Sequence, residues 1–189
     1  MKTLTIAVGY SWAPNLKKDK RWVDLKKGLL GIQQEVLKRW ESQVVKPDEI
    51  ELEAEVILDK TARSTNVMKE MAYHLEIKRL RSAPGRMIWP TICERIQRAD
   101  LVVMDLTPRE GEESTRPSVL LELGYALAQE SSGLPVYVVV SDYANQKHLV
   151  PSDLQGLHVG VIPVGGVIAD ASLRRALVND LIQQLTKIL

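Results

Sequence analysis

The sequence has little that would link the chain covalently or target it to a membrane. Its one cysteine, Cys93, excludes an internal disulfide and fits a reducing compartment. No run of about 18 apolar residues is present, and the first ten residues turn polar too soon for a signal peptide. We therefore expect a cytoplasmic protein without a membrane partner.

An excess of one charge sign is also missing. The 25 Lys and Arg against 24 Asp and Glu leave a formal net charge of +1, which argues against a nucleic-acid partner. The chain has no Gly-rich loop ending in Gly-Lys-Ser/Thr, and no Gly-x-Gly-x-x-Gly follows the first strand. It therefore lacks the phosphate-binding loops of P-loop ATPases and of Rossmann dehydrogenases. His74, His148 and His158 are scattered without zinc-ligand spacing, and no metal site is predicted.

What is present is typical of one globular α/β domain over residues 1–189. Hydrophobic residues make up 45% of the chain and charged residues 26%. Apolar or alternating runs predict strands at residues 3–8, 50–58, 101–106, 136–140 and 158–164. Recurrence at three- and four-residue steps predicts helices at residues 21–41, 65–81, 87–98, 118–130 and 170–188.

This alternation predicts a doubly wound parallel sheet between helical layers, a flavodoxin-like three-layer sandwich. Three glutamates alternate with apolar residues over 50–58, as suits an edge strand. That places the second strand at one edge and gives the order 2-1-3-4-5. The winding then reverses between strands one and three and opens a ligand crevice there.

Two carboxylates lie beside this predicted crevice. Asp105 ends the apolar strand at 101–106, where it is expected to hold a ribose or to cap a turn. Ser118, behind Pro117, is expected to cap the next helix. At roughly 100° per residue, Glu122 falls on a polar face with Ser118 and Tyr125. There it is either an ordinary solvated glutamate or a ligand-facing carboxylate that the helix dipole keeps ionised.

Two stretches then resemble a known signature. Residues 99–108, ADLVVMDLTP, and residues 116–126, RPSVLLELGYA, are similar to the "ADLVIADLT…NPNVxxELGYA" pattern of bacterial TIR-like nucleotide-binding proteins. The same pattern looks like that of nucleoside 2-deoxyribosyltransferases, whose sheet is related. Val8 to Trp12, with Trp22 and Leu25 following, resembles the first strand and helix of the TIR-like group.

The resemblance implies an enzyme that cleaves an N-glycosidic bond. Glu122 would be the catalytic carboxylate, acting on NAD or a related nucleotide and needing no further cofactor. Because nicotinamide leaves as a neutral base, a strong general acid is not needed. The predicted nucleotide-binding residues are Gly9, Tyr10, Ser11, Arg63, Asp105, Ser118 and Tyr125. The resemblance also implies a homo-oligomer and a role in antiphage defence with a separately encoded effector.

Two alternatives stay open. One is a nucleoside 2-deoxyribosyltransferase that traps a deoxyribosyl group on Glu122, and the other is a nucleotide sensor without turnover. The family's Asn-Pro-Asn is replaced by Arg116-Pro117-Ser118, so Arg116 could meet a phosphate or pair with Glu112 or Glu113. The acidic insert at 109–116 is expected to be a solvated loop or a lid. Of the Arg…Gly-Ser motif that precedes the third helix in the family, only the arginine is matched, by Arg63.

Overall fold

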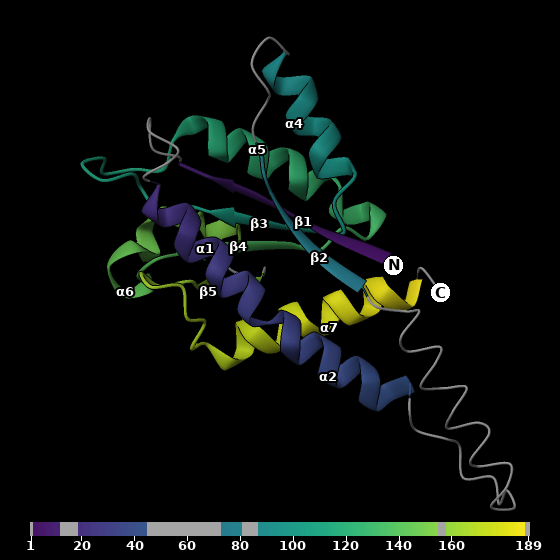
Figure 1. Ribbon diagram of the computed structural model, residues 1–189. Helices are drawn as coiled ribbons and strands as arrows, with labels where there is room; N and C mark the ends of the chain where they lie inside the picture. The colour runs from purple at the N-terminus through teal and green to yellow at the C-terminus, as the bar shows by residue number, and fades with distance from the viewer. Residues whose placement is uncertain (1, 12–18, 45–72, 81–86, 155–157, 188–189) are drawn as a thin grey trace, which may run out of the picture.

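The computed structural model describes residues 2–11, 19–44, 73–80, 87–154 and 158–187, and it contains a five-stranded, all-parallel sheet (Figure 1). The strand order β2-β1-β3-β4-β5 confirms the predicted α/β flavodoxin-like fold. The strands are β1 (Lys2–Tyr10), β2 (Tyr73–Arg79), β3 (Leu101–Asp105), β4 (Val136–Val140) and β5 (His158–Val161). The helices are α1 (Lys20–Gly31), α2 (Gln33–Val44), α4 (Ile88–Gln97), α5 (Pro117–Ala128), α6 (Tyr143–Gln146) and α7 (Ala171–Lys187).

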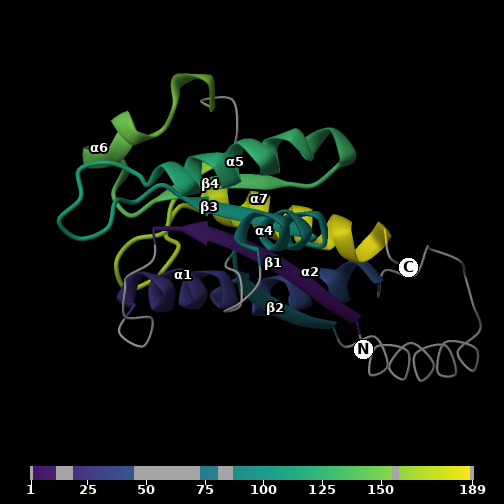
Figure 2. The same ribbon diagram turned by 90° about the horizontal axis from the view of Figure 1, so that it is seen from above.

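Two apolar cores lie on opposite faces of this sheet. The first packs α1, α2 and α7 against one face, and the second packs α4 and α5 against the other. Figure 2 shows α5 on one side of the sheet and α1 with α2 on the other. Every residue of β3 and β4 is buried, as expected of central parallel strands covered on both faces.

The strands β1 and β3 end together at the point where the winding reverses. Their register pairs Gly9 with Met104 and Tyr10 with Asp105, so both strands finish at the same edge. Side chains alternate between the faces of a strand. Gly9 therefore faces α5, while Tyr10 belongs to the core under α1 and α2.

The edge strand is not formed by the segment that the sequence pattern indicated. The predicted strand at 50–58 lies outside the described residues, and β2 occupies residues 73–79, where a helix was predicted. That prediction is wrong because Leu75 fitted a helical spacing with Met68 and Met71, while Leu75 and Ile77 also alternate with Glu76 and Lys78. The charged Glu76 and Lys78 still give the edge its expected polar character.

Smaller differences concern the ends of elements. The single helix predicted at 21–41 is two helices that break at Ile32, directly after Gly31, a residue of low helix propensity. The strand predicted at 3–8 extends through Gly9 and Tyr10, which are the last residues of β1. Arg116, not Ser118, occupies the N-cap of α5, with Pro117 at the first helical position and no side-chain cap. In the described part of the chain, no helix is long and apolar enough to cross a membrane.

Candidate functional site

Glu122 lies over the end of β1, where a glycine leaves room for it. A Cβ atom on Gly9 would stand 2.9 Å from Glu122 Oε2 and 2.5 Å from Met104 Cε. Contacts that short are not tolerated without movement, so the absence of a side chain at Gly9 creates the space that the Glu122 carboxyl fills. The carboxyl therefore sits against the central strands at the predicted switch point.

The Glu122 side chain is buried, with 4% of its surface exposed. Val119, Leu123 and Ala126 are the other buried residues of α5, whereas Leu120 and Leu121 are exposed. The predicted polar face for Glu122 is thus wrong, because the helix turns its carboxylate toward the gap above Gly9. Burial raises the pKa of Glu122 to about 7, and the described residues offer it no hydrogen bond or ion pair. The expected full ionisation by the helix dipole is not met.

Asp105 differs from Glu122 in that its carboxylate has several hydrogen-bond partners. Its carboxylate is fully buried and accepts two hydrogen bonds from Arg21, from Nε at 2.7 Å and Nη2 at 2.8 Å. Asp105 Oδ1 also accepts from the Thr107 backbone N–H at 3.2 Å and from the Thr107 hydroxyl at 2.6 Å. This geometry is that of a turn cap combined with a buried ion pair, and it uses both carboxylate oxygens.

The network continues across the edge of the sheet. Arg21 Nη1 donates to the backbone oxygen of Ile162 at 2.6 Å, beyond β5. The backbone N–H of Ser141, after β4, donates to the Thr107 hydroxyl at 2.8 Å. Arg21, Asp105 and Thr107 therefore tie the start of α1 to the ends of three strands and make this edge rigid.

A hollow of about 520 Å³ lies above this network, and we call it the carboxyl-edge hollow. Its volume is within the range of small-molecule sites, roughly 300–1,000 Å³. Among the described lining residues, cations and carboxylates are equal in number and several residues carry hydroxyls. These residues are Ser11, Asp19, Lys20, Arg21, Asp24, Thr107, Pro108, Arg109, Glu110, Ser141 and Val164. Glu122 is not among them. Within the described ranges, no group of three or more His, Cys, Asp or Glu side chains could hold a metal ion.

Ser11 connects the carboxyl-edge hollow to the end of β1. It follows Tyr10 directly and lies two residues beyond Gly9, the residue against which Glu122 packs. Ser11 is 6% exposed, and its hydroxyl oxygen is buried without a hydrogen-bond partner among the described residues. A buried hydroxyl without a partner is unfavourable in a structure that serves stability alone.

Tyr10 faces the opposite side of the sheet from Glu122. Its hydroxyl donates to Asp19 Oδ2 at 2.7 Å, and its ring stacks on Trp22 at 5.8 Å between centroids. Asp19 in turn caps α1 by accepting from the Trp22 backbone N–H at 3.1 Å. Tyr10 thus positions the start of α1, which lines the hollow.

Two other residues predicted to bind the nucleotide, Ser118 and Tyr125, are not among the described residues that line the carboxyl-edge hollow. Ser118 is exposed in the first turn of α5. Tyr125 packs against α4, where its ring meets Trp89 edge-on at 5.9 Å and its hydroxyl accepts from Gln97 Nε2 at 2.7 Å. The predicted residue Arg63 lies outside the described residues. The structure thus places Glu122 against Gly9, Ser11 in the carboxyl-edge hollow, Asp105 in the network below that hollow, and Tyr125 apart from them against α4.

The acidic insert is anchored at its far end. Arg116 pairs with Glu112 at 2.7 Å, one of the two partners that the sequence left open. The Thr115 hydroxyl donates to the backbone oxygen of Leu106 at 2.5 Å, and Thr115 itself is buried. Arg109 and Glu110, at the start of the insert, line the carboxyl-edge hollow.

Arg21 is the functional residue that sequence reasoning missed. The signal for it was indirect, since a carboxylate at the end of a buried strand needs a cationic partner. Several arginines could have supplied it, and only the position of α1 over the sheet identifies Arg21.

Comparisons with known proteins show a distant likeness to solved structures. No protein-family model and no curated protein matches the chain. Among solved structures it is similar to one described as a 2-desoxiribosyltransferase from Leishmania mexicana, at 15% identity, with 93% of this chain and 97% of that chain covered and a TM-score of 0.37. A likeness this distant carries no argument about activity, so the fold rests on the strand order.

Proposed function

We propose that this protein cleaves or transfers at an N-glycosidic bond of NAD or a related nucleotide, with Glu122 as the catalytic carboxylate. The observation that carries the proposal is the state of Glu122: buried, without a partner among the described residues, and with a pKa raised to about 7. A buried carboxyl without a partner lowers stability, and such groups are concentrated at active sites.

The chemistry follows from what the ionised carboxylate can do. Breaking a bond between a sugar and a base develops positive charge at the anomeric carbon of the sugar. A carboxylate without competing hydrogen bonds and shielded from water stabilises that charge strongly, or forms a covalent bond to the carbon. Glu122 meets both conditions, whereas Asp105, with both oxygens occupied by Arg21 and Thr107, serves to fix the edge on which the ligand rests.

The carboxyl-edge hollow is the proposed entrance for the ligand. Its mixed lining suits a nucleoside, whose hydroxyl groups can bond to Ser11, Thr107 and Ser141. Ser11 lines the hollow and lies two residues from Gly9, against which Glu122 packs, so we propose that the sugar passes Ser11 to reach the Glu122 carboxyl. Lys20 and Arg109 at the rim supply positive charge for phosphate groups.

Incubation of the purified chain with NAD, followed by detection of free nicotinamide, tests the proposal. Wild type is expected to release nicotinamide, and Glu122→Gln is expected to lose at least about 100-fold in kcat. Glu113→Gln, which changes an exposed carboxylate in the acidic insert, serves as the matched control and should retain the rate. Equal rates in wild type and Glu122→Gln would refute the assignment.

The 2-deoxyribosyltransferase alternative uses the same carboxylate and differs in its product. Incubation with a deoxynucleoside would then leave a deoxyribosyl group on Glu122, visible in the intact mass of wild type and missing in Glu122→Gln. A thermal shift with NAD but no turnover of NAD or deoxynucleosides, even at high protein concentration, would favour the sensor alternative.

We extend the proposal to assembly and biological role. Exposed apolar side chains lie at the start of α4, at Met87, Ile88 and Trp89, and in the first turns of α5, at Leu120 and Leu121. Trp89 contacts Tyr125, which lies one turn beyond Leu121 on α5. Such a patch is typical of a subunit interface and supports a homo-oligomer. The role in bacterial defence, with a separately encoded effector, rests on the sequence resemblance alone.

A further inference from the structure

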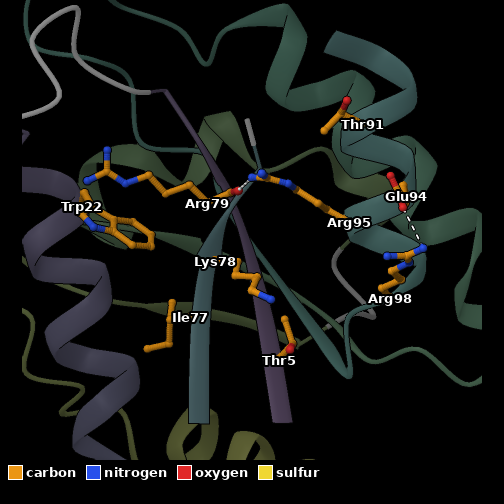
Figure 3. A pocket seen from close by; sticks show the side chains of 9 residues that line it. All are labelled: Thr5, Trp22, Ile77, Lys78, Arg79, Thr91, Glu94, Arg95 and Arg98. Carbon is orange, nitrogen blue, oxygen red and sulfur yellow. Dashed lines mark hydrogen bonds and ion pairs between the residues drawn. The ribbon is translucent and has the colours of Figure 1, made fainter. Parts of the chain in front are cut away.

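A second hollow, of about 560 Å³, lies at the β2 edge of the sheet, and we call it the β2 hollow. Figure 3 shows it from close by, with side chains arriving from β1, α1, β2 and α4. Among the described residues, its charged lining consists of four cations and one carboxylate: Lys78, Arg79, Arg95, Arg98 and Glu94. The whole chain has a net charge of only +1, so positive charge is concentrated here.

Two of the arginines have no carboxylate partner within the described residues. The Arg79 guanidinium lies 4.3 Å from the centroid of the Trp22 ring and 6.0 Å from that of Tyr10. Arg95 Nη1 donates to the backbone oxygen of Arg79 at 2.7 Å, the one hydrogen bond that Arg95 makes with described residues. Both side chains are half-buried, and a half-buried guanidinium is stabilised by an anion that supplies acceptors in its plane.

The other cations are held only by surface pairs. Arg98 pairs with Glu94 at 2.8 Å and Lys78 pairs with Glu76 at 2.8 Å, and all four side chains are at least 41% exposed. Exposed pairs of this kind contribute little and exchange readily. Arg98 and Lys78 can therefore turn to an anion in the hollow without a large loss elsewhere.

We infer that the β2 hollow binds a small molecule that carries two or more phosphate groups. The volume exceeds that of one phosphate and lies within the range of small-ligand sites. The four cations exceed what one phosphate neutralises, and the arginine forks match phosphate oxygens. Arg79 already covers the Trp22 ring, so recognition is directed at the phosphates and not at a stacked base.

This site is separate from the proposed catalytic one. Its described lining residues come from β1, α1, β2 and α4, and none of them lines the carboxyl-edge hollow or contacts Glu122 among the described interactions. The inference does not depend on the N-glycosidic activity. Failure of either proposal would leave the other standing.

Calorimetric titration of the full chain with inorganic triphosphate at low salt tests the inference. We expect saturable binding to wild type, and an affinity at least about tenfold lower for Arg79→Gln and for Arg95→Gln. Arg175→Gln removes the same charge from an exposed position on α7 and should leave the affinity unchanged. The Arg98 side chain is exposed, so Arg98→Gln is expected to fold normally. Its lower affinity for triphosphate tests the site even if Arg79→Gln and Arg95→Gln fail to fold.

One substitution should act in the opposite direction. Glu94→Gln removes the hollow's carboxylate and frees Arg98, so triphosphate should bind more tightly to it than to wild type. Three results would overturn the inference: no binding to wild type, equal loss in Arg175→Gln and Arg95→Gln, or weaker binding to Glu94→Gln. If a single-stranded RNA oligonucleotide bound more tightly than triphosphate, the inferred small-molecule ligand would be wrong and the hollow would be assigned to nucleic acid.

Discussion

Arg21 and Asp105 form a two-point ion pair between the first turn of α1 and the end of β3, with N···O distances of 2.7 and 2.8 Å. The Arg21 side chain is 16% exposed and that of Asp105 is fully buried, so the pair is shielded from water. Together with the bond from Arg21 to Ile162, it fixes the floor of the carboxyl-edge hollow.

Removal of one member of this pair should be strongly destabilising. We expect Asp105→Asn to lower the free energy of unfolding by about 3–5 kcal/mol, because Arg21 is left buried without its counter-charge. Urea denaturation measures the loss. In a double-mutant cycle, adding Arg21→Met to Asp105→Asn should recover part of it. Strictly additive effects of the two substitutions would contradict the pairing.

Glu122 should make stability depend on pH in a defined window. Its pKa is about 7 in the folded chain against an ordinary value of 4.5, so between these values the unfolded chain releases a proton that the folded chain keeps. Stability is therefore full below about pH 4.5 and falls as pH rises to 7, by about 3 kcal/mol. Glu122→Gln should remove this loss. It should match wild type in urea denaturation at pH 4.5 and exceed it at pH 8, while Glu113→Gln follows wild type throughout.

The same group should set the pH profile of catalysis. If the ionised carboxylate of Glu122 acts on the sugar, kcat/KM for nicotinamide release should rise with pH and level off above about 7. Initial rates at low NAD across this range provide the measurement. A rate that falls as pH rises through 7 would instead indicate that the protonated carboxyl acts as a general acid.

Gly9 should not tolerate even one methyl group. Gly9→Ala places a Cβ within 2.9 Å of Glu122 Oε2 and 2.7 Å of Met104 Sδ, and overpacking of this kind costs about 1–3 kcal/mol. We expect lower stability in thermal unfolding, together with lower activity. The matched control is Gly124→Ala on α5, where a Cβ meets nothing within 4 Å. In that helix it should stabilise by about 0.5–1 kcal/mol.

The apolar patch on α4 and α5 predicts the behaviour of an assembly variant. Leu121 is 65% exposed on α5 and Ile88 is 64% exposed on α4, and a charge at either position is incompatible with a dry interface. Leu121→Glu should reduce the mass measured by sedimentation equilibrium to that of the monomer. Arg175→Gln, on the exposed side of α7, should not. A wild-type monomer at high concentration would contradict the homo-oligomer proposal.

Sequence reasoning succeeded where one physical signal was strong. The apolar runs of β3 and β4 and the leucine stripe of α7 each fit only one kind of element, and their alternation led to the correct strand order. It failed at β2, where Leu75 fits a helical period with Met68 and a strand period with Ile77. Periodicity cannot separate these cases when the run is short.

At the candidate site, too, the sequence predicted some features and missed others. The position of Glu122 near the switch point followed from element order, but its burial did not, because a helical wheel assigns any carboxylate to the outer face. The missing information was tertiary: Gly9, more than a hundred residues earlier, opens the gap that the carboxyl enters. Arg21 was missed for the same reason, since its partner Asp105 is 84 positions away.

The end of β1 lies between the packing around Glu122 and the Trp22 side of the β2 hollow. Gly9 meets the carboxyl of Glu122, and Tyr10, the next residue, stacks on Trp22 beneath the Arg79 guanidinium. One peptide group thus joins the packing around the proposed catalytic acid to the wall of the β2 hollow. The Tyr10 ring and the Glu122 carboxyl are therefore held by neighbouring residues of one strand end, so a substitution at Gly9 or Tyr10 acts on the same short piece of backbone.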